Sequence, residues 1–388
     1  MRNEIDRSAI VVTSWPGQAS RAELERLAAA GEQPRKDYVE LARLLNADVI
    51  DSHHMAERAT LPARWVESRV GIVQGQIAET FLRRGEYRHI IAWADRLGLP
   101  LGLLFKLTRS RRDLVLISVW LSHLKKAVFL KPLKAHTHLG AIINYGSKQM
   151  EIAADRLGVP RDKLHLALQP VDERFWRPNG TPVENIICSV GSEARDYPTL
   201  INAIRGLDLG VDLAVGSTVL RPSGDAVAMF TPMIREISGT DLPPNVRVHR
   251  GLEHRKLRGL YCRSRFVVVP LHDIEFDAGV TALTEAMAMG KAVIVTRTRG
   301  QIDLIRDGEQ GIYVPPGDPA ALRTAIAYLH SHPEEAERMG RAGRALVEHR
   351  HTLDAYVERV AAIVWGTDEA GIEVSGRHRA DAHSACSD

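Results

Sequence analysis

Short runs of β-branched and other apolar residues alternate along the chain with longer segments in which apolar residues recur every three or four positions. The short runs predict strands at 10–13, 48–50, 89–93, 114–118, 141–145, 164–168, 186–190, 213–215, 246–249, 266–270, 292–296 and 311–314. Helical periodicity separates them, as at 37–46, where we expect Asp37 to be the N-cap. The apolar face of that helix would comprise Tyr38, Leu41, Leu44 and Leu45. Such alternation is typical of parallel sheets in an α/β architecture.

The same alternation occurs twice, which predicts two doubly wound units in tandem. Residues 178–182, PNGTP, are rich in turn formers and mark the linker, so the units would be 1–177 and 178–350. Residues 366–388 are polar and lack periodicity, and we expect them to be disordered. Ligands of doubly wound units bind beyond the carboxyl ends of the strands, so a cleft between the two units is expected.

Composition narrows the class of protein. The chain has 388 residues, 45% hydrophobic and 26% charged, which is enough for two soluble domains. A net charge of +3 gives no indication of a nucleic-acid partner. Cys188, Cys262 and Cys386 lack the spacing of a metal site and indicate two structural thiols and one tail thiol in a reducing compartment. No apolar run reaches the ~18 residues that span a bilayer, so we expect a cytoplasmic protein.

One acidic stretch precedes a short helix in the second half, within the run LHDIEFDAGVTALTEAMAMGKAVIVT at 271–296. The helix begins near Gly279 and contains Glu285. A helix N-terminus exposes unpaired N–H groups and suits a phosphate. Carboxylates accept hydrogen bonds from sugar hydroxyls, and the approach carries three of them, Asp273, Glu275 and Asp277. The layout fits a nucleotide-sugar.

Several motifs carry a family resemblance. They are LALQPVDERFWRP, IICSVGSEARDYPTLINAI, VRVHRGLEHRKLRGLYCRSRFVVVPL and TEAMAMGKAVIVTRTRGQIDLIRDGEQGIYVPPGDPAALRTAI. These motifs and their order resemble the C-terminal donor-binding domain of family 4 glycosyltransferases. The resemblance covers most of 164–364. The resemblance implies the GT-B fold, in which two Rossmann-like, doubly wound domains face each other across a cleft. It also implies that the last helix, 351–365, crosses back to the first domain.

The resemblance assigns roles to the acidic stretch. Asp277 and Glu285 have the eight-residue spacing of the two acids that frame the donor helix in this family. Asp277 would hold hydroxyls of the transferred sugar, and Glu275 would share this task because Asp is one methylene shorter than the usual Glu. Glu285 would hold the ribose hydroxyls. The diphosphate would meet the amides just beyond Gly279, those of Val280, Thr281 and Ala282.

A second phosphate contact is expected after the strand at 186–190, where Gly191 begins a short loop. By resemblance, an Arg directly after this Gly and a Lys a few residues later would bind the diphosphate. Arg195 can replace the Lys, but Ser192 cannot replace the Arg. The base pocket would be lined by His249, Arg250 and Gly251.

The acceptor side resembles the family less. Relatives carry a histidine after the strand matching 114–118, where this chain has Val119 and Trp120. His123 would reach the cleft from one helical turn away, or the role is absent. Asp95, which follows the strand at 89–93, is the other candidate acid facing the cleft. His136 and His138 are further candidates, although this spacing makes a poor metal site.

Basic residues dominate 106–134, where Asp113 is the single acid. This face could contact anionic lipid at the inner membrane surface and reach a lipid-linked acceptor. A solvated basic helix would show the same pattern, and a phosphate-bearing soluble acceptor would use the same charges.

These observations predict a retaining, hexosyltransferase-type enzyme that moves a sugar from a nucleoside-diphosphate sugar to an acceptor hydroxyl. Retention follows from the resemblance. Helix amides and Arg195 could stabilise the departing diphosphate without a metal ion, and the chain has no D-x-D motif, so no metal or cofactor is expected. The alternative is a degenerate GT-B protein that binds a nucleotide-sugar or a partner without catalysis, which Ser192 and Val119 favour.

Overall fold

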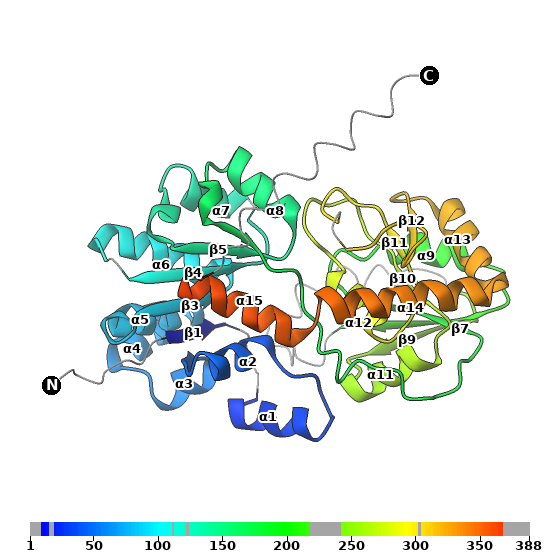
Figure 1. Cartoon of the computed structure of the whole chain (residues 1–388), viewed down its shortest axis with the longest axis horizontal. Helices are drawn as coiled ribbons and strands as arrows, with labels where there is room; N and C mark the ends of the chain where they lie inside the picture. The colour runs from blue at the N-terminus through cyan, green and yellow to red at the C-terminus, as the bar shows by residue number, and fades with distance from the viewer. Residues whose placement is uncertain are drawn as a thin grey trace.

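The computed structural model describes residues 9–14, 19–110, 112–121, 124–216, 242–301 and 304–367. Within these ranges the strands form two six-stranded sheets, and each sheet is the centre of one lobe (Figure 1). The described strand pairs are all parallel. Because helices cover both faces of each sheet, inner strands such as those at 89–93, 186–190 and 293–296 are buried on both sides, whereas the edge strand at 246–250 is not.

The N-terminal lobe has the strand order β2-β1-β3-β4-β5-β6. Its strands are β1 (Ala9–Thr13), β2 (Asp48–Ile50), β3 (His89–Trp93), β4 (Asp113–Ser118), β5 (Ala141–Asn144) and β6 (Leu164–Leu166). Its α-helices are α1 (Arg21–Ala29), α2 (Asp37–Leu44), α3 (Ser52–Glu57), α4 (Leu61–Val70), α5 (Ile72–Arg83), α6 (Asp95–Thr108), α7 (Leu124–Leu130) and α8 (Ser147–Glu151).

The C-terminal lobe has the strand order β12-β11-β10-β7-β8-β9. Its strands are β7 (Ile186–Val190), β8 (Gly210–Val215), β9 (Val246–Arg250), β10 (Val267–Val269), β11 (Val293–Thr296) and β12 (Gly311–Val314). Its described helices are α9 (Tyr197–Ile204), α11 (His254–Arg263), α12 (Val280–Ala288), α13 (Pro319–Ser331) and α14 (Pro333–Arg350). Ligands of such sheets bind at the carboxyl ends of the strands.

Every predicted strand is present, but the start of α2 differs from its prediction. The N-cap is Lys36, and Asp37 is the first helical residue, whose carboxylate accepts a hydrogen bond from the Tyr38 N–H at 2.9 Å. Leu44, assigned to the apolar face, is 46% exposed. The buried face is rotated toward Val39 because α2 packs against both β1 and the last helix.

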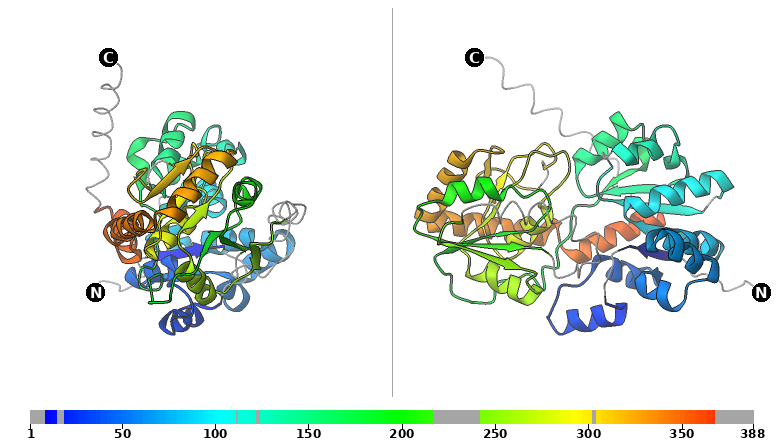
Figure 2. Two further views of the ribbon diagram at one scale, coloured as in Figure 1. Left: turned by 90° about the vertical axis from the view of Figure 1, so that its right-hand side faces the viewer. Right: turned by 180° about the vertical axis from the view of Figure 1, so that it is seen from behind.

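The last helix, α15 (Leu353–Trp365), continues from the C-terminal lobe but packs on the N-terminal one (Figures 1 and 2). The Thr352 hydroxyl caps it by accepting a hydrogen bond from the Ala355 N–H. Its buried residues share a core with β1, β3, β4, β5 and α2. Most of the tail that we expected to be disordered, from residue 368 onward, lies outside the described residues.

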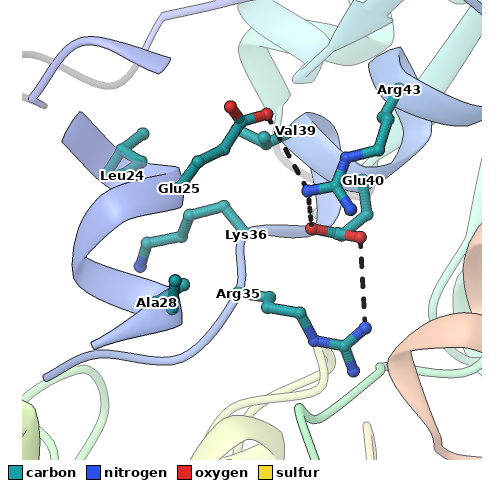
Figure 3. A pocket seen from close by; sticks show the side chains of 9 residues that line it. Leu24, Glu25, Ala28, Arg35, Lys36, Val39, Glu40 and Arg43 are labelled. Carbon is teal, nitrogen blue, oxygen red and sulfur yellow. Dashed lines mark hydrogen bonds and ion pairs between the residues drawn. The ribbon is translucent and has the colours of Figure 1, made fainter. Parts of the chain in front are cut away.

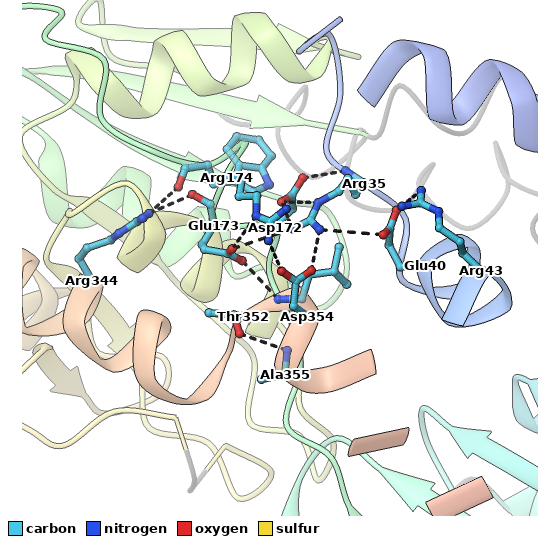
Figure 4. Close-up of polar contacts among 12 residues, drawn as sticks. Arg35, Glu40, Arg43, Asp172, Glu173, Arg174, Arg344, Thr352, Asp354 and Ala355 are labelled. Carbon is cyan, nitrogen blue, oxygen red and sulfur yellow. Dashed lines mark hydrogen bonds and ion pairs between the residues drawn. The ribbon is translucent and has the colours of Figure 1, made fainter. Parts of the chain in front are cut away.

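An ionic network ties the lobes together where the linker meets α15 (Figure 4). The Arg35 guanidinium donates to the Asp172 carboxylate at 2.8 and 3.0 Å, and the Arg35 N–H donates to it at 2.8 Å. Arg35 also donates to Asp354 of α15 at 2.6 Å, and Arg174 pairs with the same carboxylate. Asp172 lies in the segment between β6 and β7, so this network joins the N-terminal lobe, the segment that leads into the C-terminal lobe and the crossing helix.

Two buried cysteines, Cys188 and Cys262, are free thiols as predicted, whereas Cys386 is outside the described residues. No helix in the described ranges combines the length and apolar character needed to cross a membrane.

Candidate functional site

The N-terminus of α12 lies at the carboxyl end of β10, where the acidic stretch enters the helix. Gly279 is the N-cap, with a left-handed φ of +78° and no side chain to bond the first-turn amides. The first turn consists of Val280, Thr281 and Ala282. A Cβ at Gly279 would lie 2.9 Å from Val269 Cγ1, so only glycine fits without displacement. An uncapped helix N-terminus of this kind favours a bound anion.

Arg195 faces this helix from the loop after β7. Its side chain is buried, and it donates from Nε to the Val190 carbonyl at 2.9 Å and from Nη1 to the Glu193 carbonyl at 2.8 Å. A Cβ at Gly191 would lie 2.3 Å from Arg195 Nη2, and one at Gly279 would lie 3.4 Å from Nη1. Burial lowers the pKa of Arg195, and no hydrogen bond to a carboxylate of the described residues compensates its charge. A buried guanidinium without a direct carboxylate partner therefore lies beside the helix amides, and Glu193 and Glu285 act on its charge only from a longer distance.

Glu285 lies within α12 and faces Tyr261 of α11, whose hydroxyl donates to Oε2 at 3.0 Å. Burial raises the pKa of Glu285 to about 7, and the Tyr261 hydrogen bond, Lys36 and Arg195 act in the opposite direction. Lys36 belongs to the N-terminal lobe, so a charge on the other side of the cleft lowers the pKa of Glu285. Burial lowers the pKa of Lys36.

A pocket of about 230 Å³ lies between α1 and α2, and Lys36 is part of its lining (Figure 3). Its other charges are already paired, because Arg43 contacts Glu40 at 2.8 Å and Glu25 at 3.8 Å. Arg35 contacts Glu40 at 4.0 Å. Lys36 takes no part in these ion pairs. The pocket therefore belongs to the packing of α1 on α2, and Lys36, whose pKa Asp37 and Glu285 also affect, lies in its wall.

Asp277 and Glu275 contact the N-terminal lobe in different ways. The Asp277 carboxylate lies against Gly146, where an added Cβ would be 2.1 Å from Oδ2, and both residues line a small interlobe cavity. The Glu275 carboxylate pairs with Arg156 of the N-terminal lobe at 3.2 Å and with Arg299 at 3.4 Å. Asp277 thus faces the cleft, whereas Glu275 forms an ionic contact between the lobes.

Asp95 is the first residue of α6, at the carboxyl end of β3, and it is 3% exposed. Its Oδ2 accepts hydrogen bonds from Lys126 Nζ at 2.8 Å and from the Trp120 N–H at 3.1 Å. The Trp120 ring stacks on Phe276 of the acidic stretch, with centroids 4.5 Å apart. A stacked aromatic pair thus connects the two lobes beside the predicted donor site. His123 lies outside the described residues.

The other sequence candidates are more scattered. Arg250 and Gly251 lie at the carboxyl end of β9, and the Gly251 N–H donates to the Val215 carbonyl at 3.2 Å. The His249 ring contacts Asp212 of β8 at 3.0 Å. The base-pocket role of these residues stays a prediction. His136 and His138 precede β5 and lie at the opposite edge of the sheet from Asp95, so they are not part of this site.

The structure adds three residues to the site that sequence analysis did not assign to it: Lys36, Lys126 and Tyr261. In the sequence, Lys126 appeared only as part of a basic run, and Tyr261 only within one of the motifs that carry the family resemblance. Their roles depend on partners from distant parts of the chain, and no local pattern indicates those partners.

Comparisons with known proteins agree with this architecture. Residues 211–346 match the model of the family described as "Glycosyl transferases group 1". The D-inositol 3-phosphate glycosyltransferase of Thermomonospora curvata is 31% identical over 156 residues, which cover 40% of this chain and 33% of that protein. The D-rhamnosyltransferase WbpZ of Pseudomonas aeruginosa is 38% identical over 80 residues, 20% of this chain and 21% of that protein. The aligned segments thus span a fifth to a third of these curated relatives.

Solved structures extend the likeness over both lobes. HepE from Anabaena in complex with UDP-glucose has a TM-score of 0.67 at 14% identity, covering 92% of this chain and 99% of that one. Sucrose-phosphate synthase from Thermosynechococcus elongatus has a TM-score of 0.66 at 17% identity, covering 92% and 98%. The chain therefore has the GT-B fold. The match to the model of glycosyl transferases group 1 lies within its C-terminal lobe.

Proposed function

We propose that this protein is a glycosyltransferase that moves a sugar from a nucleoside-diphosphate sugar to an acceptor hydroxyl. The observation that carries the proposal is the buried Arg195 guanidinium, which has no carboxylate partner among the described residues and lies beside the uncapped N-terminus of α12. A buried cation without a direct ion pair is costly, and an anionic ligand there would offset that cost. The HepE complex with UDP-glucose supports a nucleotide-sugar as that ligand.

The donor would lie along α12. Glu285 would accept hydrogen bonds from the ribose hydroxyls, and the first-turn amides with Arg195 would bind the diphosphate. Asp277 would hold hydroxyls of the transferred sugar, because its carboxylate faces the cleft at Gly146. Glu275 is engaged by Arg156 and Arg299, so it would act on the sugar only after those contacts rearrange.

The proposed reaction retains the anomeric configuration and uses no metal ion. Family 4 likeness supports retention, and the amides with Arg195 support metal independence, since they would stabilise the charge that develops on the leaving diphosphate. The bond from the anomeric carbon to the phosphate oxygen breaks, and the electron pair stays on that oxygen. The acceptor hydroxyl attacks from the same face and gives its proton to a diphosphate oxygen. Closure of the lobes would exclude water.

The acceptor face lies on the N-terminal lobe. Exposed apolar residues, Leu107 and Val128, occur in the same segment as the exposed basic side chains of Arg109, Lys131 and Lys134. This combination supports an acceptor that is lipid-linked or carries a phosphate, with peripheral contact at an anionic membrane surface.

A panel of nucleotide-sugars tests the proposal by thermal shift and by release of nucleoside diphosphate. One donor should raise the melting temperature and be hydrolysed slowly in the absence of acceptor. Glu285→Ala should abolish the shift, while Glu337→Ala, at an exposed position on α14, should leave it unchanged. Tight binding of a donor without release of diphosphate would favour the non-catalytic alternative. Binding of no donor at all would refute the proposed enzyme and leave only the alternative that binds a partner.

A further inference from the structure

In the proposed donor site, Arg195 provides one positive charge, whereas the donor diphosphate carries at least two negative charges. Arg195 is the cation that the C-terminal lobe places beside the N-cap Gly279, with Nη1 3.4 Å from the position of an added Cβ. Ser192, in the same loop, is uncharged, and its hydroxyl accepts a hydrogen bond from the Gly216 N–H at 2.7 Å. The Ser192 hydroxyl is therefore engaged by the backbone directly after β8. A buried diphosphate needs a further cation, because unbalanced buried charge is costly.

Lys126 of α7 lies on the other side of the cleft and is held in place by two hydrogen bonds. Its ammonium donates to Asp95 Oδ2 at 2.8 Å and to the Trp120 carbonyl at 2.6 Å. These bonds use two of its three protons. The side chain is 26% exposed, so the third proton is available to a ligand.

The stacked rings of Trp120 and Phe276 link this ammonium to the donor helix. Lys126 Nζ is 5.7 Å from the Trp120 ring centroid, and the two ring centroids are 4.5 Å apart. Phe276 is followed by Asp277, Ala278 and then the N-cap Gly279. The charge of Lys126 also acts on Glu193, whose carbonyl is bonded to Arg195. The ammonium is thus held near the same end of α12 as Arg195.

We propose that Lys126 supplies the second positive charge on the donor diphosphate, and that Asp95 and the Trp120 carbonyl position it. This inference rests on the proposed function and names a residue for it. The diphosphate would then bridge the lobes, with Arg195 on one side and Lys126 on the other. When the bond to the sugar breaks, Lys126 would donate a hydrogen bond to the leaving phosphate and remain protonated.

A different role would be purely structural, in which Lys126 only neutralises the buried Asp95. Both roles predict that Lys126→Gln lowers thermal stability, because Asp95 loses its ion pair. They differ in the dependence on phosphate. A phosphate-binding lysine discriminates nucleoside diphosphate from the parent nucleoside, and a structural lysine does not.

The experiment compares the affinities of the full-length protein for nucleoside, nucleoside monophosphate and nucleoside diphosphate, with the base found in the donor panel. Lys126→Gln should weaken diphosphate binding roughly tenfold or more, since a charge-assisted hydrogen bond is lost, and leave nucleoside binding unchanged. Lys126→Arg should restore most of the loss. Lys131→Gln, an exposed position just after α7, is the matched control and should behave as wild type.

If Lys126→Gln does not fold, the double variant Asp95→Asn/Lys126→Gln removes both charges and serves for the same measurement. An unchanged ratio of diphosphate to nucleoside affinity in either variant would overturn the role of Lys126 and leave the proposed function standing. Failure of the wild type to bind any nucleoside diphosphate would overturn both.

Discussion

Glu285 makes stability and donor binding depend on pH in a way that can be measured. Burial raises its pKa from the ordinary 4.5 to about 7. Because the folded protein holds this proton more tightly than the unfolded chain, the contribution to stability is fully present below pH 4.5. It is lost as the pH rises toward 7. With 1.36 kcal/mol per pKa unit, the shift corresponds to about 3 kcal/mol.

Glu285→Gln removes this ionisation and keeps an acceptor for the Tyr261 hydroxyl. The free energy of unfolding of the variant, relative to wild type, should therefore increase by about 3 kcal/mol between pH 4.5 and pH 8. For a domain of this size that is roughly 5–10 °C in melting temperature. Thermal denaturation from pH 4.5 to pH 8.5 measures it. Glu337→Gln, at a position 74% exposed, is the control and should show no such trend.

Donor affinity should change in the opposite direction to stability. The ionised carboxylate is the better acceptor for two ribose hydroxyls, so wild-type nucleoside affinity should increase between pH 6 and pH 8. Below pH 7 the decrease should approach tenfold per pH unit if only the ionised form binds. A melting-temperature difference between Glu285→Gln and wild type that stays constant with pH would refute the assigned burial of this carboxyl.

Two further predictions concern the helix N-terminus and the interlobe network. Gly279→Ala should abolish donor binding, because its Cβ would meet Val269 at 2.9 Å and occupy the phosphate approach. Gly308→Ala has a nearly identical φ of +79° and nothing within 4 Å, so it should show only a backbone cost of about 1–2 kcal/mol in stability. Isothermal titration calorimetry measures the donor affinity of both variants. Arg35→Ala should cost about 3 kcal/mol in urea denaturation, since the buried Asp172 loses its ion pair and keeps only the hydrogen bond from the backbone N–H of residue 35. The exposed Arg43→Ala should cost less than about 1 kcal/mol. Equal losses in the two arginine variants would contradict the importance of the network.

The strands and the donor helix were predictable because their signals are local. Apolar runs such as 186–190 and 311–314 coincide with β7 and β12, since a strand buried on both faces needs a continuous apolar run. Gly279 and Glu285 lie within one loop and helix, so their spacing in the sequence fixes their spacing in space. The N-cap of α2 was misplaced because Asp37 bonds its neighbour Tyr38 and does not cap the helix.

The other half of the site depends on contacts that no local pattern encodes. Lys126 lies 31 residues from Asp95, and the sequence shows it only as one member of a basic run. Glu275 lies 119 residues from Arg156, so its ionic contact between the lobes could not be inferred from an acidic loop. Glu285 affects the pKa of Lys36 only because the two lobes face each other. In each case the partner is fixed by tertiary folding.

The packing of α15 on the N-terminal lobe has a consequence for biosynthesis. Leu353, Tyr356 and Val360 complete a core that also contains residues of β1. The ribosome must add 187 residues (353 − 166 = 187) between the end of β6 and the start of α15. At 5–20 residues per second this takes roughly 10–40 s, during which that apolar surface lacks its cover. The lobe that is made first is thus completed last, and its unfinished core is open to aggregation during that interval.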